Sequence, residues 1–321
     1  MPSTRIPNVL AALLLSASAA AAAERVTVAA VAVEKTAFIV TLTDGSVLKG
    51  PQLAGAVITV ALPGGGQAEI RIDSVETDPA DPDITLYGLS GRDSATGNWT
   101  NLCLPDPKGV TKGFPMRGAL GADSEYHPDA PGFSLTCVAG VQAKCVRWGY
   151  KPWIEMSGGV PMIDLYRTCM RMARADYCGD GIGATRNGTV IDLYDIAGIQ
   201  RPETEAPMPF EAAWTPKGAI CVRHTRLPDV VDLEKLVARC PRLAGAVGET
   251  CSENAPGALL FNRSARISRG SSCSSGRATG NASGGYCRAG AEASPKGVLK
   301  FALQTRITFV PQLTSRSIQH S

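Results

Sequence analysis

The stretch that decides the fold is Pro161–Gly181, PMIDLYRTCMRMARADYCGDG. Its apolar side chains recur with the 3.6-residue period of an amphipathic helix, at Met162, Leu165, Cys169 and Met172. The opposite stripe is basic and is expected to face water, at Arg167, Arg171 and Arg174. Because proline suits a first helical turn and glycine a helix stop, we predict one helix over Met162–Cys178, ended by Gly179.

Four strings in and around this helix resemble a single family. Ala175-Asp176-Tyr177-Cys178, followed by Gly-Asp-Gly, is similar to the signature of the ADYC-domain proteins, a group of secreted, mainly bacterial proteins. The other three similar strings are Lys144–Trp153, Asn187–Asp195, and Ala213-Trp214 leading into Ala219-Ile220-Cys221. The resemblance covers roughly residues 102 to 240 and implies an exported domain, but it implies no reaction and no ligand.

The first 23 residues are typical of a signal peptide. Arg5 supplies the positive start, an uncharged and mostly apolar run begins at Val9, and Ala21-Ala22-Ala23 offers small residues for cleavage. A membrane-spanning helix needs about 20 apolar residues, and no stretch of the chain reaches that length. We therefore predict a secreted or periplasmic protein that does not span the membrane.

The charges of the chain are nearly balanced, with 32 basic and 29 acidic residues. A balance of this kind gives no long-range attraction to nucleic acid or to an anionic membrane. We therefore predict no nucleic-acid partner, and consider a cell-surface polymer or protein as the partner instead.

The chain has ten cysteines, at positions Cys103, Cys137, Cys145, Cys169, Cys178, Cys221, Cys240, Cys251, Cys273 and Cys287. An even number in an exported chain predicts disulfides, whereas three histidines and no CxxC argue against structural zinc. The connectivity stays open, although Cys240 with Cys251 and Cys273 with Cys287 are plausible on proximity in the sequence alone. Nine residues of helix would place Cys169 and Cys178 about 13 Å apart, so they should bond to different partners.

The remaining patterns predict an α+β fold with few helices. Residues 24–100 alternate as strands, with a hairpin at Asp44-Gly45, and predict an N-terminal antiparallel sheet or partly open barrel. Residues 101–245 form the disulfide-rich, ADYC-like α+β domain, with a second helix over Asp229–Cys240. Residues 246–321 are predicted to form a Ser/Gly/Arg-rich loop, followed by closing strands within Val298–Val310.

Aromatic side chains gather at Trp148, Tyr150 and Trp153, next to Lys151. They are candidates for a platform on which a sugar ring stacks, but aromatic residues in an aromatic-poor chain are more often core, and we favour core. His224, alone on a predicted strand, is favoured as a packing or surface residue over a catalytic one.

Carboxylates and amides cluster after the helix, at Asp176, Asp180, Asn187, Asp192 and Asp195. The candidate calcium ligands are Asp180, Asn187 and Asp192. The candidate acid–base groups of a glycoside hydrolase are Asp176, Asp180 and Asp192. The candidates for binding a ligand are Asp180, Asp192 and Asp195. Asp and Asn beside glycine also build turns without a ligand, and this interpretation is favoured. In particular, the Asp176 carboxylate is expected to accept hydrogen bonds from the backbone of the glycine-rich loop that follows it.

No motif for a nucleophile, a metalloprotease or a cofactor is present. GxSxG and HExxH are absent, and the glycines at 179, 181 and 183 follow a helix instead of a strand, which is the wrong order for a dinucleotide site. We therefore predict no cofactor and no metal. Two functions stay open: a disulfide-stabilised binding or structural module, which we favour, and a hydrolase of polysaccharide or cell-wall polymer that uses the Asp cluster.

Overall fold

The computed structural model describes residues 26–61, 66–121, 124–186, 188–205, 207–265 and 309–310. The predicted leader, Asn187, Cys273, Cys287 and most of the Ser/Gly/Arg-rich loop lie outside these ranges. The described residues are mostly strands, with three α-helices and four disulfides, and this confirms a disulfide-rich α+β fold.

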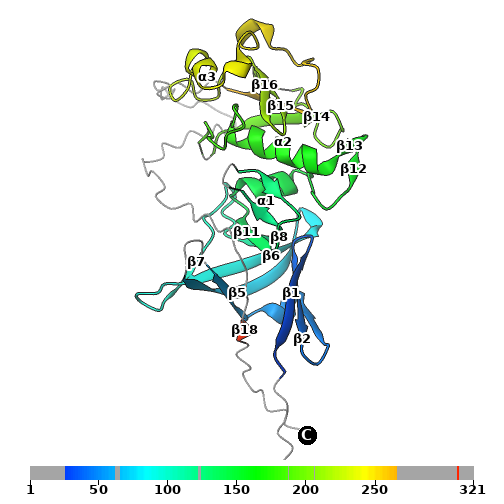
Figure 1. Cartoon of the computed structure of the whole chain (residues 1–321), viewed down its shortest axis with the longest axis vertical. Coiled ribbons are helices and arrows are strands. Elements are labelled where there is room, and N and C mark those ends of the chain that lie inside the picture. The colour runs from blue at the N-terminus through cyan, green and yellow to red at the C-terminus, as the bar shows by residue number, and fades with distance from the viewer. Residues whose placement is uncertain are drawn as a thin grey trace, which may run out of the picture.

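Two antiparallel sheets occupy one end of the elongated molecule, with the strands from β1 to β7 in blue and cyan in Figure 1. The three-stranded sheet contains β1 (Val28–Glu34), β2 (Ala37–Leu42) and β3 (Val47–Lys49). The seven-stranded sheet has the order β11-β8-β6-β5-β4-β18, with β7 beside β6. Its strands are β4 (Val57–Ala61), β5 (Gln67–Asp78), β6 (Asp81–Arg92), β7 (Trp99–Asn101), β8 (Gly113–Arg117), β11 (Phe133–Cys137) and β18 (Phe309–Val310).

The predicted hairpin at Asp44-Gly45 is confirmed, since β2 pairs with β3. The turn between β2 and β3 holds Asp44, whose Oδ1 accepts a hydrogen bond from Ser46 N at 2.9 Å, and Gly45 at φ 83°. Strand β4 pairs with β5, with Ile58 opposite Ile70. The segment from Asp78 to Pro82 forms the tight turn from β5 to β6; Pro79, Ala80 and Pro82 are exposed, whereas Asp78 is only 1% exposed.

The other end of the molecule is built around the four-stranded antiparallel sheet β14-β17-β15-β16 (Figure 1). Its strands are β14 (Ile191–Asp195), β15 (Phe210–Thr215), β16 (Gly218–Val222) and β17 (Leu260–Ser264). Helix α2 (Met162–Arg174) packs on this sheet and on α1 (Val141–Arg147), and α1 contacts β11 of the seven-stranded sheet. These two helices therefore link the two ends.

Short elements complete the chain. They are η1 (Gly50–Leu53), β9 (Ala119–Leu120), β10 (Tyr126–His127), β12 (Met156–Ser157), β13 (Val160–Pro161), α3 (Leu233–Arg239), η2 (Pro241–Leu243) and η3 (Gly248–Thr250). Helix α3 falls within the predicted Asp229–Cys240 and is capped at its N-terminus by Asp232, whose side chain accepts a hydrogen bond from Lys235 N. None of the helices in the described ranges is long and apolar enough to cross a membrane.

One continuous hydrophobic core extends from Phe38 to Leu260. Phe38 of β2 joins the first two sheets, because its ring meets Tyr87 of β6 and Phe133 of β11 edge-on, with centroids 5.3 and 5.1 Å away. The predicted apolar face of α2 lies in the same core.

The predicted basic stripe of α2 does not face water, and the helix ends earlier than expected. Arg171 is 4% exposed and pairs with Asp176, Arg174 donates to Gly181 O, and Arg167 donates to Tyr126 O. The reason is that segments on both sides of the helix in sequence cover this stripe and supply acceptors, the chain before it for Arg167 and the loop after it for Arg171 and Arg174, which periodicity alone does not reveal.

The four disulfides join Cys103–Cys137, Cys145–Cys169, Cys178–Cys240 and Cys221–Cys251, with Cα separations of 5.3 to 5.9 Å. Cys169 and Cys178 have different partners, as predicted. The pair of Cys240 with Cys251, plausible from proximity in the sequence, does not form, because the end of α3 lies against the loop that follows α2, while Cys251 lies beside β16.

Candidate functional site

The signature Ala175-Asp176-Tyr177-Cys178 ends helix α2 and turns the chain toward the four-stranded sheet. Ala175 is left-handed (φ 51°), its N–H bonds to Met172 O, and the N–H of Asp176 bonds to Arg171 O at 2.9 Å. This pair of hydrogen bonds is a Schellman cap, which glycine usually supplies. The helix therefore stops at Ala175, four residues before the predicted stop at Gly179.

Asp176 is fully buried and is hydrogen-bonded within the protein. Its carboxylate accepts hydrogen bonds from Gly179 N and Gly181 N, both at 3.0 Å, and from Arg171 Nη1 at 2.7 Å. The prediction that this carboxylate fixes the glycine-rich loop to the helix is confirmed. A carboxylate held in this way is closed to solvent and is better suited to holding a turn than to transferring protons.

Tyr177 carries the signature into the core between α2 and the sheet. Its hydroxyl donates to Glu211 Oε1 at 2.9 Å and accepts from Arg226 N at 2.8 Å. Its ring stacks on Trp214 at a centroid distance of 5.2 Å. The next residue, Cys178, bonds to Cys240. Every residue of the signature thus has a structural partner.

Glu211 and Arg226 form a buried ion pair at the centre of this network. Arg226 Nε and Nη2 lie 3.0 and 3.1 Å from the Glu211 oxygens; Nη2 also donates to Met172 O and Nη1 to Ala173 O, at the end of α2. Burial acts to raise the pKa of Glu211, but the Arg226 charge and several hydrogen bonds hold it below its ordinary value. The pair therefore stays ionised and fastens α2 to strand β15.

Sequence reasoning missed this pair. The available signal was a glutamate beside apolar residues, in the string Glu211-Ala212-Ala213-Trp214. These residues lie on strand β15, and both faces of the strand are buried. A charge in such a place requires a buried partner, but the sequence does not say which arginine supplies it.

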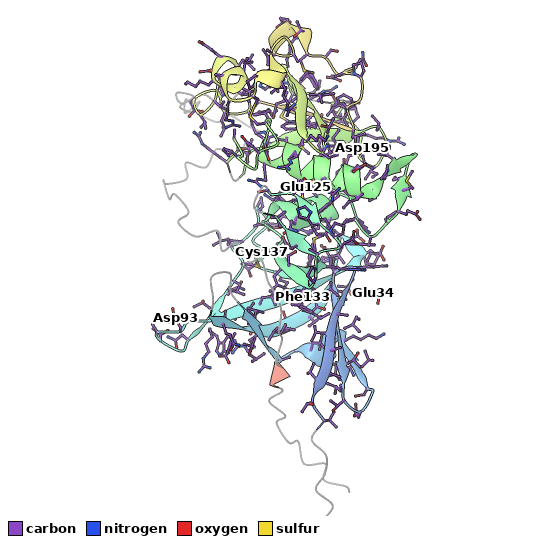
Figure 2. All side chains as sticks on the ribbon, viewed as in Figure 1. Glu34, Asp93, Glu125, Phe133, Cys137 and Asp195 are labelled. Carbon is purple, nitrogen blue, oxygen red and sulfur yellow. A yellow bond between two sulfur atoms is a disulfide. The ribbon has the colours of Figure 1, made fainter. Side chains whose placement is uncertain are left out.

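The other aspartates of the predicted cluster have separate partners. Asp180 is exposed, accepts from Ile182 N at 2.9 Å and lies 3.6 Å from Arg239. Asp192 of β14 accepts from Glu203 N and lies 3.7 Å from Arg263. Asp195 accepts from three backbone amides of the following turn and from the Tyr150 hydroxyl at 2.8 Å. Figure 2 shows Asp195 at the α2 end of the molecule.

No group of three or more metal-binding side chains is found within the described ranges. Asn187, one of the three candidate calcium ligands, lies outside them. The calcium hypothesis therefore stays a prediction.

The three aromatic candidates do not form one platform. Tyr150 is fully buried, and burial together with the adjacent Asp195 raises its pKa. Trp148 and Trp153 are half-buried and line two different grooves. His224 is buried, as a packing residue would be, and its Nδ1 lies 3.2 Å from Thr225 O.

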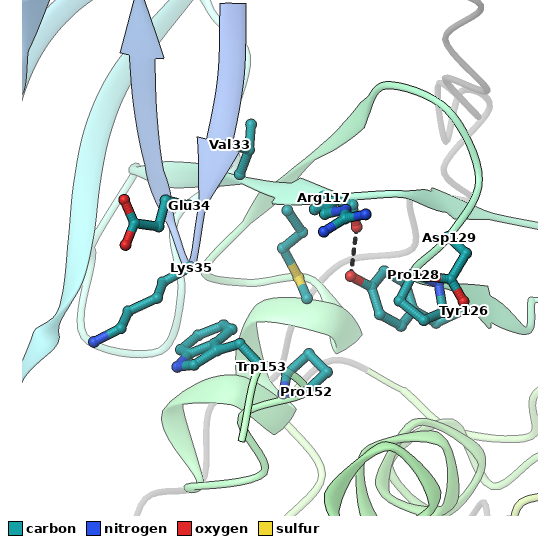
Figure 3. A pocket seen from close by; sticks show the side chains of 10 residues that line it. Val33, Glu34, Lys35, Arg117, Tyr126, Pro128, Asp129, Pro152 and Trp153 are labelled. Carbon is teal, nitrogen blue, oxygen red and sulfur yellow. Dashed lines mark hydrogen bonds between the residues drawn. The ribbon is translucent and has the colours of Figure 1, made fainter. Parts of the chain in front are cut away.

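The larger groove has a volume of about 410 Å³, and we call it the Trp153 groove (Figure 3). It is lined by the β1–β2 turn, β8, the segment from β10 onward and the loop after α1: Val33, Glu34, Lys35, Met116, Arg117, Tyr126, Pro128, Asp129, Pro152 and Trp153. This volume lies within the range of known ligand pockets. Glu34, at the tip of β1, and Asp129 lie on opposite sides of the view in Figure 3.

Tyr126 closes the inner wall of this groove. Its hydroxyl donates to the carbonyl oxygen of Arg117, the contact dashed in Figure 3, and burial raises its pKa to about 12. A neutral phenol committed to a backbone oxygen shapes the groove and supplies no reactive oxygen. The Trp153 indole and the neighbouring prolines offer apolar surface, while Glu34, Arg117 and Asp129 offer exposed charges.

The sequence profile of the ADYC domain matches residues 50–228, which is more than half of the chain. The chain therefore belongs to the ADYC domain family. A search of curated proteins finds no match, and a search of solved structures finds none either.

Proposed function

We propose that this protein is an exported, disulfide-stabilised binding module that holds a cell-surface polysaccharide in the Trp153 groove. The observation that carries the proposal is the half-buried indole of Trp153, set beside Pro152 and Pro128 in an open groove. Aromatic faces bind the apolar faces of sugar rings, and exposed charges around them fix orientation.

Export is part of the proposal. Four disulfides are typical of an oxidising compartment, and the first 23 residues have the pattern of a signal peptide. In this proposal the N-terminal β region (24–100) precedes the disulfide-rich part in the mature chain, and the groove opens where the two meet.

A binding role is favoured over the hydrolase because of what the aspartates do. Asp176 is closed to solvent, and Asp180 and Asp192 have unrelated partners on a loop and a strand. None of the three lines the Trp153 groove. A glycoside hydrolase needs two carboxyl groups facing each other across a cleft, about 5 to 10 Å apart.

The test is retention of the mature protein on purified cell-wall polysaccharide. Replacement Trp153→Ala should weaken binding about tenfold, the effect of losing about 1.4 kcal/mol of contact energy. Trp99→Ala is the matched control, because Trp99 is half-buried on β7, where it contacts the Arg71 guanidinium instead of the groove. Equal retention of the two variants would reject the groove as the site. Release of sugars that Asp176→Asn abolishes, at an unchanged melting temperature, would favour the hydrolase.

A further inference from the structure

A second groove, of about 330 Å³, lies beside the turn from β5 to β6, and we call it the Lys144 groove. It is lined by that turn, the loop after β7 and helix α1: Asp78, Ala80, Asp81, Asp106, Pro107, Lys108, Val138, Lys144, Arg147 and Trp148. A chain of ion pairs connects it with the Trp153 groove. Lys35 meets Asp83 at 3.2 Å, Asp83 meets Lys151 at 3.2 Å, and Lys151 meets Asp81 at 2.7 Å. Lys35 lines one groove and Asp81 the other.

The carboxylates of the Lys144 groove are all engaged within the protein. Asp78 accepts from Arg147 Nε at 2.7 Å and from Ala80 N at 3.0 Å. Asp106 accepts from Arg147 Nη1 at 3.4 Å and from the backbone amides of Lys108 and Val110 at 2.8 and 2.9 Å. Asp81 pairs with Lys151. The three carboxylates of the lining thus share two cations, Arg147 and Lys151, and the backbone amides of Ala80, Lys108 and Val110 supply further donors.

Two further ammonium groups of the lining have no such partner. Neither Lys144 on α1 nor Lys108 on the facing loop makes a side-chain hydrogen bond or ion pair with any residue in the described ranges. Lys144 is half-buried, and its burial lowers its pKa, an effect that the more distant charge of Asp106 opposes. A partly desolvated ammonium without a hydrogen-bonded partner is costly, and an anionic group in the groove would relieve that cost.

The third feature is the half-buried indole of Trp148, the residue after Arg147, which packs against the hydrophobic core and also lines the groove. Its backbone oxygen accepts from Gln200 Nε2 at 2.8 Å, which fixes the backbone that carries the ring, while its indole N–H has no acceptor among the described residues. One aromatic face and two ammonium donors in a single groove match a sugar ring that bears a carboxylate.

We propose that the Lys144 groove binds a carboxylate-bearing sugar, with the ring against Trp148 and the carboxylate between Lys144 and Lys108. This site is separate from the Trp153 groove, and it goes beyond the proposed function because it selects for acidic sugars. An acidic polysaccharide lying across the ion-pair chain could occupy both grooves, but the assignment of the Lys144 groove does not require this.

The probe is trigalacturonate, compared with its methyl ester, which has the same rings without the charge. Calorimetric titration of the mature chain should show binding of the acid and at least tenfold weaker binding of the ester. Lys144→Gln and Lys108→Gln should each weaken binding of the acid about tenfold, the equivalent of about 1.4 kcal/mol. Lys217→Gln, an exposed lysine in the β15–β16 turn, is the control and should leave it unchanged.

Lys108→Gln changes only an exposed loop side chain, so it tests the site even if Lys144→Gln lowers stability. Equal binding of acid and ester, or full binding by both variants, would overturn the proposal. Competition by inorganic phosphate as strong as that by the sugar acid would overturn the sugar assignment and leave a simple anion site. Trp153→Ala separates the two proposals, because it should leave trigalacturonate binding intact even where it abolishes retention on cell wall.

Discussion

At the scale of single residues, Asp176 distinguishes a structural signature from a catalytic one. Asp176→Asn keeps the size of the side chain but removes the charge that pairs with Arg171 and one of the two acceptors that hold the loop at Gly179 and Gly181. We expect the free energy of unfolding to fall by about 3 kcal/mol, since a buried ion pair loses one partner. Chemical denaturation of the oxidised mature protein measures this.

Asp180→Asn is the matched control, four residues along the same loop. Asp180 is exposed and lies 3.6 Å from Arg239, so its loss should cost less than about 1 kcal/mol. If both variants were as stable as the wild type, Asp176 would not be the clamp that its contacts describe.

The Glu211–Arg226 pair predicts how stability depends on acid. The pKa of Glu211 in the folded protein lies below the ordinary value of 4.5, so the unfolded chain takes up its proton first. The stability from the carboxylate is therefore fully present above about pH 4.5 and is lost as the pH falls through the lower folded value. Glu211→Gln should lower the melting temperature at neutral pH, and the difference from wild type should shrink toward about pH 2. A difference that stays constant over this range would contradict the assignment.

The sequence predicts the behaviour of Asp176 but not that of Glu211, for a physical reason. Asp176 interacts with amides three and five residues away, so glycines nearby in the chain reveal its role. Glu211 and Arg226 meet only because β15 and the segment after β16 both pack under the end of α2. The two grooves likewise combine distant segments, such as Lys35 with Trp153, which no local pattern joins.

At the scale of elements, α2 shows what periodicity can and cannot predict. Its start and its buried face agree with the 3.6-residue pattern, because burial of an apolar stripe determines both. Its end does not, because Ala175 adopts the left-handed conformation that glycine was expected to provide. Helix α1 was not predicted: Val141–Arg147 is too short to show a period, and Cys145 fixes it to α2 through Cys169.

The disulfides that join elements should differ in their resistance to reduction. Cys145 and Cys169 are fully buried between α1 and α2, whereas Cys178 is half-buried and its Sγ lies 2.9 Å from the Arg239 guanidinium. The thiolate of the reductant needs access to a disulfide sulfur, and a nearby cation stabilises the protein thiolate that is released. With limiting reductant, we expect Cys178–Cys240 to open before Cys145–Cys169.

The measurement is alkylation of the partly reduced native protein, followed by mass spectrometry of the cysteine peptides. Reduction of Cys145–Cys169 first would show that the helix pair opens more readily than its burial indicates. Denatured, unreduced protein is the control, and we expect it to show no thiol at any of the eight described positions.

At the scale of the whole molecule, the matched family segment ends before the fold is complete. Residues 50–228 include β14, β15 and β16, but β17 (Leu260–Ser264) lies between β14 and β15 and pairs with both. On β17, Asn262 accepts from Trp214 Nε1 at 2.7 Å and donates to Glu211, so it also completes the buried network. Cys178 and Cys221 find their partners beyond residue 228 as well.

We therefore expect a chain of residues 24–265 to fold and a chain of residues 24–228 to fail. The shorter chain lacks the strand between β14 and β15, and it lacks two disulfides worth about 3 to 4 kcal/mol each. Circular dichroism should show a cooperative thermal transition for 24–265 and none at comparable temperature for 24–228. Thiol counting should find Cys178 and Cys221 of the shorter chain free or bonded to each other. Cooperative unfolding of 24–228 with both cysteines reduced would show that β17 and its network are additions to a core that is stable without them, and that the family segment is the folding unit.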